Sequence, residues 1–469
     1  MNQALAALLK PCGPDLATAA GSRAMETLAR AAERDGWADV LAEASAALDP
    51  VFSASPYLAG LAARTPGRLR RILEADPEAR LAAILAESDA LKVAAFDQAK
   101  RRLREFKAET HLLTALADLG GVWSLDQVTG ALTRFADAAL AVAVALAARA
   151  EVERGRLVAV APGDPRGPIP GYFCIAMGKF GAFELNYSSD IDFCAFFDPD
   201  ALPLAPDAEP QALASRVTKQ IAELLQERTV DGYVFRVDLR LRPDPSSTDP
   251  AVSLPAALDY YESVGQNWER AAFIKARASG GDTGAGEAFL VALQPFIWRR
   301  NLDFAAIADI HSIKRQIHVY KVDDRLAAKG ADLKLGHGGI REIEFYAQTQ
   351  QLILGGRDPG LRSPRTIEAL RALARVGHIP DAAAEELARA YATLRALEHR
   401  AQMIADEQTH KLPEAETERR RIAVLSGESD LRRFDASVER VLKSVNRRYG
   451  ELFAEDEDLS SRFGSLVFT

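Results

Sequence analysis

Two aspartates one residue apart follow a glycine-lysine turn in the segment GKFGAFELNYSSDID, residues 178–192. Apolar runs at 173–177 and 191–197 border the segment, and their aromatic and β-branched residues predict two buried strands. Because side chains alternate across a strand, Asp190 and Asp192 are expected on one face. Two carboxylates in one patch repel each other, so the pair predicts a compensating hard cation, Mg²⁺ or Mn²⁺.

The turn before these aspartates has the residues that a phosphate site needs. Gly178 allows the backbone to approach a phosphate closely, Lys179 supplies a positive charge, and Ser188 and Ser189 add hydroxyl donors. A lone D-x-D pair often only begins a surface strand, and the turn is what favours the metal-site interpretation. The spacing fits neither a P-loop nor a dinucleotide-binding glycine motif.

A third carboxylate is expected from the run GYVFRVDLRL at 232–241, which alternates as a strand does. Asp238 shares one face with Arg236 and Arg240, so Asp238 is predicted to bind metal while the two arginines hold phosphoryl oxygens. Asp190, Asp192 and Asp238 would then form a catalytic centre for two metal ions. The alternative is a surface strand in which Asp238 pairs with the flanking arginines.

These motifs carry a family resemblance. The glycine-lysine turn, the D-x-D pair and Asp238 resemble the polymerase-β-like nucleotidyltransferase superfamily, which more often has serine where Lys179 stands. Four longer strings resemble the glutamine synthetase adenylyltransferase/deadenylylase family over roughly residues 90–450. They are GKFGAFELNYSSDID, VDLRLRP at 237–243, NWERAAFIKAR at 267–277 and GGIREIEFYAQTQQL at 338–352.

The resemblance implies a direction of reaction. Proteins of this family are typically fusions of two related halves: the C-terminal half attaches AMP from ATP to a tyrosine of glutamine synthetase, and the N-terminal half removes it by phosphorolysis. This chain has one D-x-D site of this kind, which suggests one half. A helical region before the strands, the initial Met1 and the strings GIREIEF and GGRDPGLRS favour the N-terminal, adenylyl-removing half.

The expected reaction follows from that resemblance. Inorganic phosphate is the co-substrate, ADP is the product, and two Mg²⁺ or Mn²⁺ ions are the cofactors. The implied partners are adenylylated glutamine synthetase, the PII signal protein in its uridylylated form, and the C-terminal adenylyltransferase half of the full-length protein. Three alternatives stay open: ATP-dependent adenylylation of glutamine synthetase, a nucleotidyltransferase acting on nucleic acid, and a non-catalytic module that binds PII.

Composition restricts the remaining classes. The net charge of −8 disfavours a nucleic-acid partner, which usually requires a basic surface. Three cysteines without metal-binding spacing favour a reducing, cytoplasmic location. Two of them, Cys174 and Cys194, fall in the apolar strands and are expected to pack in the core. The apolar run at 138–148 is too short to cross a bilayer, so it predicts a buried helix and no membrane association.

The organisation along the chain predicts an α+β protein that is predominantly α. A helical region at 1–160 precedes a nucleotidyltransferase domain at 161–300, with a small mixed sheet and a helix at 211–228. A helical bundle at 301–469 follows, with long helices at 304–328, 339–354, 381–409 and 430–456.

Two further helical segments are of interest. Arg341, Glu342 and Glu344 lie on a helix that follows a glycine-rich loop, and they are candidates for a supporting shell around the site. The alternative is a helix start whose acids are stabilised by the helix dipole. The residues of the string at 267–277, taken singly, are expected on a solvated amphipathic helix.

Overall fold

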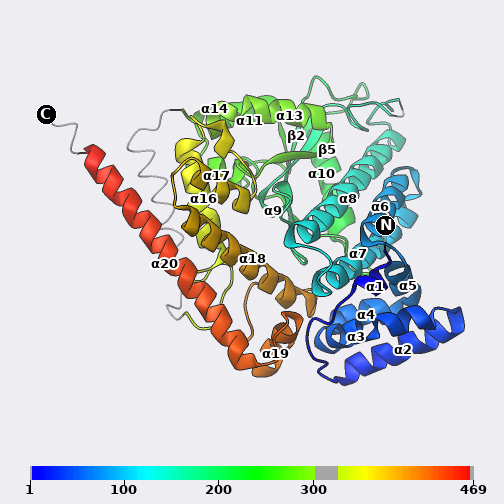
Figure 1. Cartoon of the computed structure of the whole chain (residues 1–469). Helices are drawn as coiled ribbons and strands as arrows, with labels where there is room; N and C mark the ends of the chain where they lie inside the picture. Colours follow the sequence, from blue (N-terminus) through cyan, green and yellow to red (C-terminus); the bar gives the residue numbers. More distant parts are fainter. Residues whose placement is uncertain (1–2, 162, 301–325, 465–469) are drawn as a thin grey trace. The chain divides into compact units, whose positions relative to one another are not determined.

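The computed structural model describes residues 3–161, 163–300 and 326–464. The chain divides into two compact units: the first comprises Met1–Trp298 and Met403–Gln408, and the second comprises Arg299–Gln402 and Thr409–Thr469. The predicted regions 1–160 and 161–300 therefore lie together in the first unit. The predicted class, α+β with mostly helices and a small mixed sheet, is confirmed (Figure 1).

The first unit begins with helices. Prolines stand at the start of three of them, where the missing N–H would be unsatisfied in any case. The side chains of Thr18, Ser55, Asp76 and Ser124 accept backbone N–H groups as N-caps. The helices are α1 (Leu5–Leu8), α2 (Ala19–Asp35), α3 (Ala38–Ala54), α4 (Pro56–Arg64), α5 (Pro66–Glu74), α6 (Pro77–Asp89), the 3₁₀ helix η1 (Ala90–Val93), α7 (Phe96–Leu119) and α8 (Leu125–Glu153).

Helix α8 contains the apolar run that was expected to form a buried helix. By length and composition α8 could cross a membrane, but 78% of its most apolar stretch is buried inside the protein. It packs against α7, α10 and β5, and it approaches β5 so closely that a Cβ on Gly280 would lie 3.0 Å from Leu140 Cγ. The run therefore forms a core helix, as predicted.

The sheet has five strands in the order β3-β2-β1-β5, with β4 also paired to β2. Strand β1 is antiparallel to both of its neighbours, whereas β2 runs parallel to β3 and β4. The strands are β1 (Tyr172–Ala176), β2 (Ile191–Phe197), β3 (Val237–Asp238), β4 (Ala251–Ser253) and β5 (Arg277–Gly281). The two strands predicted from the apolar runs are thus the central pair of the sheet.

Burial on both faces explains why β1 and β2 read as continuous apolar runs. Phe173, Phe196 and Phe289 form an aromatic cluster with ring centroids 4.6–5.8 Å apart. Cys174 and Cys194 are fully buried, and burial raises the pKa of the Cys174 thiol to about 12. Both cysteines pack in the core as predicted.

The prediction of a ten-residue strand at 232–241 was wrong, because only Val237–Asp238 pairs as a strand. The backbone N–H groups of Val234 and Phe235 both donate to the carbonyl of Leu225, 2.9 and 3.0 Å away, near the end of α10. After the strand, the N–H of Arg240 donates to the Asp238 carboxylate over 2.8 Å. Hydrogen bonds to the end of α10 before the strand, and to the Asp238 side chain after it, thus replace strand pairing on either side of Val237–Asp238.

The remaining helices of the first unit surround the sheet. Helix α10 (Pro210–Gln226) confirms the helix predicted at 211–228. The string at 267–277 is not a solvated helix, which corrects that expectation: Arg270 is fully buried and donates to the carbonyls of Phe296 and Ile297, and Lys275 is buried against Glu184. The other helices are α11 (Leu254–Ser263), α12 (Asn267–Phe273), α13 (Thr283–Ala292) and α14 (Gln294–Ile297).

The second unit is helical where the structure describes it. The helices predicted at 339–354 and 430–456 correspond to α16 (Ile340–Leu354) and α20 (Leu431–Gly464). Most of the helix predicted at 304–328 lies outside the described residues. The other elements are η2 (Pro359–Leu361), α17 (Thr366–Arg375), α18 (Asp381–Met403) and α19 (Glu416–Leu425).

The prediction of a helix over 381–409 was wrong at its C-terminal end, because α18 ends at Met403. Residues 403–408, here called the strap, belong instead to the first unit. Ser55 Oγ donates to the carbonyl of Met403 over 2.6 Å, and the N–H of Tyr57 donates to the carbonyl of Ile404 over 3.2 Å. These bonds end the helix and fix the strap beside α4.

Candidate active site

Strand pairing brings two of the predicted carboxylates together. In the parallel β2–β3 ladder Ile191 is paired with Val237 and Asp192 with Asp238, and the N–H of Ile191 donates to the carbonyl of Arg236 over 2.9 Å. Paired residues of neighbouring strands project from the same face. Asp192 and Asp238 therefore lie side by side at the edge of the sheet, and both are partly exposed.

The glycine-lysine turn lies against this pair. Strand β1 ends at Ala176 and the short helix α9 (Gly178–Gly181) follows, which is the strand-to-helix turn that the sequence predicts. Gly178 has φ +53°, and a Cβ there would lie 3.0 Å from Asp192 Oδ2. Glycine at this position leaves space directly beside the Asp192 carboxylate.

Asp190 precedes β2 and meets a different set of partners. Arg236 Nε donates to Asp190 Oδ1 over 2.8 Å, and Gln408 Nε2, from the strap, donates to Oδ2 over 2.9 Å. Arg236 also donates to the backbone carbonyl of Ser188 and to its Oγ. Burial lowers the pKa of Arg236, but Tyr233 and Asp190 raise it by more, so the guanidinium stays charged.

Asp238 pairs with Arg240, as the alternative interpretation expected. Arg240 Nε lies 2.9 Å from Asp238 Oδ2, yet its side chain is 82% exposed. Burial raises the pKa of Asp238, but hydrogen bonds from Arg240 outweigh it and hold the pKa below its usual range. Such an exposed pair contributes little stability, so Arg240 can leave Asp238 at small cost.

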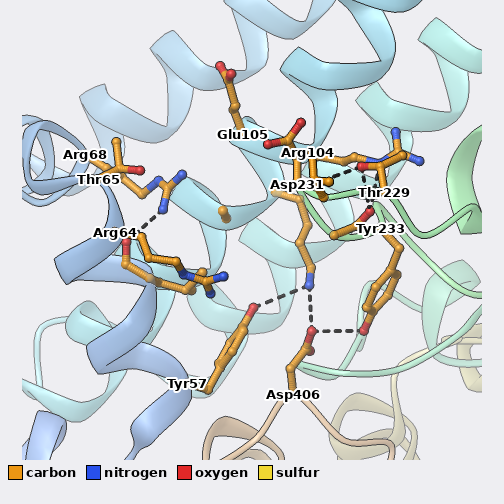
Figure 2. Close-up of a pocket in the computed structure, with 15 residues that line it drawn as sticks. Tyr57, Arg64, Thr65, Arg68, Arg104, Glu105, Thr229, Asp231, Tyr233 and Asp406 are labelled. Carbon is orange, nitrogen blue, oxygen red and sulfur yellow. Dashed lines mark hydrogen bonds and ion pairs between the residues drawn. The ribbon is translucent and has the colours of Figure 1, made fainter. Parts of the chain in front are cut away.

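Asp190 stands at one end of a continuous set of polar contacts, which we call the relay. Arg236 Nη1 donates to Tyr233 Oη over 2.9 Å. Tyr233 Oη donates in turn to Asp406 Oδ2 over 3.0 Å (Figure 2). Lys107 Nζ lies 2.8 Å from the same oxygen. The relay thus runs from Asp190 through Arg236, Tyr233 and Asp406 to Lys107.

The far end of the relay is buried. The Lys107 side chain is 7% exposed and that of Asp406 is 11% exposed. Burial lowers the pKa of Lys107. Burial also raises the pKa of Asp406, but the attraction to Lys107 and His111 and the hydrogen bonds from Lys107 and Ser188 together outweigh it and leave that pKa below its usual range. Beyond Lys107, Tyr57 Oη lies 3.1 Å from Nδ1 of His111, whose pKa falls to about 3 because it is buried.

The donor set fits a hard divalent cation in its chemistry. Asp192 and Asp238 supply carboxylate oxygens side by side, and Gly178 leaves room next to one of them. Across the ranges that the structure describes, no group of three or more His, Cys, Asp or Glu side chains is gathered closely enough to ligate one ion. Asp190 faces Arg236 and Gln408 instead, so a three-carboxylate centre stays a prediction.

The other predicted site residues are distributed as follows. Lys179 and Ser189 are partly exposed, and Ser188 is buried. Arg341, Glu342 and Glu344 lie on α16 in the second unit. There Arg341 is exposed, buried Glu342 accepts the N–H of Gly338 over 2.9 Å, and Glu344 accepts the hydroxyl of Tyr391 over 3.3 Å. Glu342 thus accepts a backbone N–H just before its own helix and stabilises the helix N-terminus.

Sequence reasoning missed the strap and the buried part of the relay. Asp406 and Gln408 fall at the end of a pattern that continues helically, and Lys107 and Tyr233 carry no motif. A local signal was absent because the partners lie far apart: Lys107 and Asp406 are separated by 299 positions. Asp406 has φ +52°, a conformation more accessible to Asp and Asn than to most residues, but the sequence does not reveal it.

A small mixed sheet that presents paired aspartates beside a glycine turn defines the class of nucleotidyltransferases. The model of the family described as glutamate-ammonia ligase adenylyltransferase matches residues 45–292, more than half of the chain. The chain belongs to this family. A second model, described as GlnD PII-uridylyltransferase, matches residues 311–453.

Curated relatives agree with this assignment. A protein of Caulobacter vibrioides named bifunctional glutamine synthetase adenylyltransferase/adenylyl-removing enzyme is 66% identical over 467 residues, covering 99% of this chain and 47% of that protein. Proteins of the same name from Bradyrhizobium diazoefficiens and Rhizobium meliloti are 53% and 48% identical, covering 86% and 89% of this chain and 41% and 43% of theirs. The chain spans about half the length of the curated relatives that it matches.

Proposed function

We propose that this chain removes AMP from adenylylated glutamine synthetase by phosphorolysis of the AMP–tyrosine bond. The observation that carries the proposal is the match, at 66% identity and over 99% of the chain, to the N-terminal half of a relative whose name contains both activities. Relatives of about twice the length carry two activities, and this chain has one D-x-D pair after a glycine-lysine turn. A chain of about half that length with a single D-x-D pair of this kind supports one of the two reactions.

The proposed centre uses Mg²⁺ or Mn²⁺ held by Asp190, Asp192 and Asp238. Bound divalent ions would neutralise phosphoryl charge and lower the barrier for in-line displacement. The pairing of Asp192 with Asp238 in the sheet supports this role, and Asp190 joins them when it exchanges its contacts with Arg236 and Gln408.

The residues around the carboxylates orient the substrate. Lys179 and the backbone of the turn at Gly178 hold the AMP phosphate, and Ser188 and Ser189 add donors from the loop before β2. Arg236 is fixed by Tyr233 and Ser188, so its guanidinium is held ready beside Asp190. This preorganisation reduces the reorganisation needed when phosphoryl charge arrives.

The bonds balance without a covalent enzyme intermediate. An oxygen of inorganic phosphate forms a bond to the phosphorus of AMP–tyrosine, and the bond between that phosphorus and the tyrosine oxygen breaks. The tyrosine oxygen takes up a proton, and ADP leaves. The chain's residues therefore bind and orient the two phosphates, and none of them is required as a nucleophile.

The test incubates the chain with adenylylated glutamine synthetase, Mg²⁺ and phosphate, and measures ADP. We expect ADP that depends on both phosphate and Mg²⁺. A parallel reaction with unmodified glutamine synthetase and ATP measures pyrophosphate, which reports the opposite, adenylylating direction. Pyrophosphate without phosphate-dependent ADP would replace the proposal by ATP-dependent adenylylation.

A matched pair of variants assigns the activity to the centre. Asp192→Asn removes a proposed metal ligand, whereas Asp259→Asn makes the same chemical change at an exposed position of α11 in the same unit. ADP release should be lost in the first variant and kept in the second. Equal activity of the two variants would separate the activity from the carboxylate pair.

A second role, binding of the PII signal protein, is favoured by the match of residues 311–453 to the model described as GlnD PII-uridylyltransferase. We propose that the second unit binds PII, with the uridylylated form preferred. Equilibrium binding of both PII forms to the chain and to Asp192→Asn tests it. Binding with no ADP release by the unaltered chain would support a non-catalytic PII-binding module.

A further inference from the structure

The first unit contains a cavity that is separate from the candidate active site. It has a volume of about 350 Å³, within the range of small-molecule sites, and lies between α4, α5, α7 and the loop at 229–233 (Figure 2). None of the candidate metal ligands lines it. Three residues of the relay, Lys107, Asp406 and Tyr233, also line this cavity.

Charge in this cavity is unevenly compensated. Of its three acidic residues, Glu105 pairs with Arg101 and Arg102 on its own helix, at 3.7 and 2.5 Å, and Asp406 pairs with Lys107. The third, Asp231, acts on Arg104, where its charge opposes the lowering of the arginine pKa by burial. Arg104 is saturated by backbone, because it donates to the carbonyls of Lys100, Leu224, Glu227 and Gly232. Arg104, Glu105 and Asp406 therefore stabilise the walls of the cavity, and most of their hydrogen-bonding groups are already used within the protein.

Arg64 and Arg68 have a different environment. Arg64 is exposed and donates to the carbonyl of Gly60 over 3.1 Å, and Arg68 is 8% exposed and donates to the carbonyl of Leu61 over 2.8 Å. Among the residues that the structure describes, neither guanidinium is in an ion pair. Burial lowers the pKa of Arg68. The attraction of the Glu109 carboxylate opposes this effect in part, and the neighbouring charges of Arg71 and Arg64 add to it.

A buried cation next to a second cation is unfavourable unless an anion joins them. Each guanidinium carries five N–H donors, so most of the donors of Arg64 and Arg68 remain available to a ligand. Guanidinium groups match tetrahedral oxyanions through paired hydrogen bonds. The ring of Tyr233, across the view of Figure 2 from these arginines, and that of Tyr57, below Arg64, provide a surface for an organic body.

We propose that this cavity binds a small molecule carrying a phosphate-like oxyanion, held between Arg64 and Arg68. Lys107 is shared between the cavity floor and the relay, so occupancy also orders the strap through the contact between Lys107 and Asp406. The cavity is then an effector site, distinct from the carboxylates that act on substrate. Neither statement depends on the proposed phosphorolysis.

Inorganic sulfate is the probe, because it has the shape of phosphate but cannot form ADP. Its binding is measured by calorimetry on the full chain, without metal and at constant ionic strength. Arg64→Gln, at an exposed position, should weaken sulfate binding about tenfold or more, as expected for loss of a charge-assisted hydrogen bond. Arg70→Gln removes the same charge on α5 outside the cavity and should leave binding unchanged, as should Asp192→Asn at the candidate active site.

The result that overturns the site is sulfate binding that is absent, or that is equal in the unaltered chain and in Arg64→Gln. Binding that is lost in Lys179→Gln but survives in Arg64→Gln would place the anion at the candidate active site and equally overturn it. These outcomes are independent of whether the chain makes ADP.

The link to the relay has its own readout. Amide hydrogen exchange of the peptide containing residues 403–408, followed by mass spectrometry, should slow when sulfate binds and should not respond in Arg64→Gln. Sulfate binding with no change of exchange in the strap would overturn the link and leave a binding site without coupling.

Discussion

The first unit contains two groups of carboxylates that differ in burial: Glu151 on α8, and the aspartates at the edge of the sheet. Glu151, at the end of α8, is fully buried, and both of its oxygens are occupied by side-chain donors. The donors are Arg154, Arg156, Arg216 and Gln220, at 3.0, 3.2, 3.4 and 2.7 Å. At the sheet edge, Asp190, Asp192 and Asp238 are partly exposed, and Arg240, the partner of Asp238, is itself mostly solvated.

The difference between the two centres lies in how deeply their carboxylates are buried. Burial raises the pKa of Glu151, but its hydrogen bonds and nearby arginines outweigh that effect, so the group stays charged and joins α8 to α10. Its coordination is complete without a ligand. At the sheet edge the carboxylates themselves are partly exposed, so a cation from solvent can reach them and exchange with their present contacts.

The largest expected effect is on the sheet edge. Asp192→Asn should reduce ADP release on the order of 10³-fold, because metal ions supply several kcal/mol of transition-state stabilisation and each ~1.4 kcal/mol is tenfold in rate. Thermal unfolding should be unchanged, since the variant removes one of two neighbouring negative charges. Single-turnover ADP release and a melting curve measure the two effects. Retained activity with an intact fold would move the catalytic role away from this pair.

Glu151→Gln should produce the opposite pattern. We expect the free energy of unfolding to fall by about 2 kcal/mol, because a neutral amide cannot satisfy the converging donors and leaves arginine charges unpaired. The rate of ADP release per folded molecule should not change. Urea titration measures the stability, with Glu223→Gln, exposed on α10, as the control. A loss of rate in folded protein would erase the distinction between the centres.

Asp406→Asn tests a group that belongs to both types, buried like Glu151 but joined to Asp190 through the relay. It should lower kcat/KM about tenfold, as expected for loss of a group that orients a ligand. It should also lower stability, because Lys107 is left as a buried unpaired charge. Adding Lys107→Met should restore stability but not activity. Glu407→Gln, at the exposed neighbouring position, is the control.

The smallest effect is expected at His111, which is buried at the far side of the relay near Lys107 and Asp406. Its folded pKa of about 3 is below the unfolded value of ~6.5, so its neutral form supports folding above the unfolded pKa and stability is lost as the pH falls toward 3. Between pH 7 and 5.5 this amounts to about 1 kcal/mol. His111→Gln should flatten that part of the stability profile in urea titrations; an unchanged slope would assign the acid sensitivity to other groups.

The sequence predicted those parts of the molecule whose signals are local. Strands β1 and β2 show as apolar runs because both of their faces are buried, and the strand-to-helix turn shows through Gly178. The pairing of Asp192 with Asp238 agrees with the prediction that they share a site, although β3 is only two residues long. Turn signals at the site were therefore more informative than strand length.

The parts that depend on distant contacts could not be read from the sequence. The end of α18 is decided by hydrogen bonds from α4 to the strap, and the helical pattern of 381–409 contains no trace of them. The burial of Arg270 was equally hidden, because the distant groups to which it donates are backbone carbonyls of α14, and carbonyls carry no sequence signature.

The strap also has a consequence for the time course of synthesis. Its six residues leave the ribosome only after the stretch Arg299–Gln402 has been made, which takes roughly 5 to 20 s at bacterial rates of translation. Until then the nascent first unit lacks two groups of the strap. They are the Gln408 amide, which donates to Asp190, and the Asp406 carboxylate, which neutralises Lys107. Formation of these contacts is thereby tied to synthesis past Gln408, and products that terminate earlier would lack them.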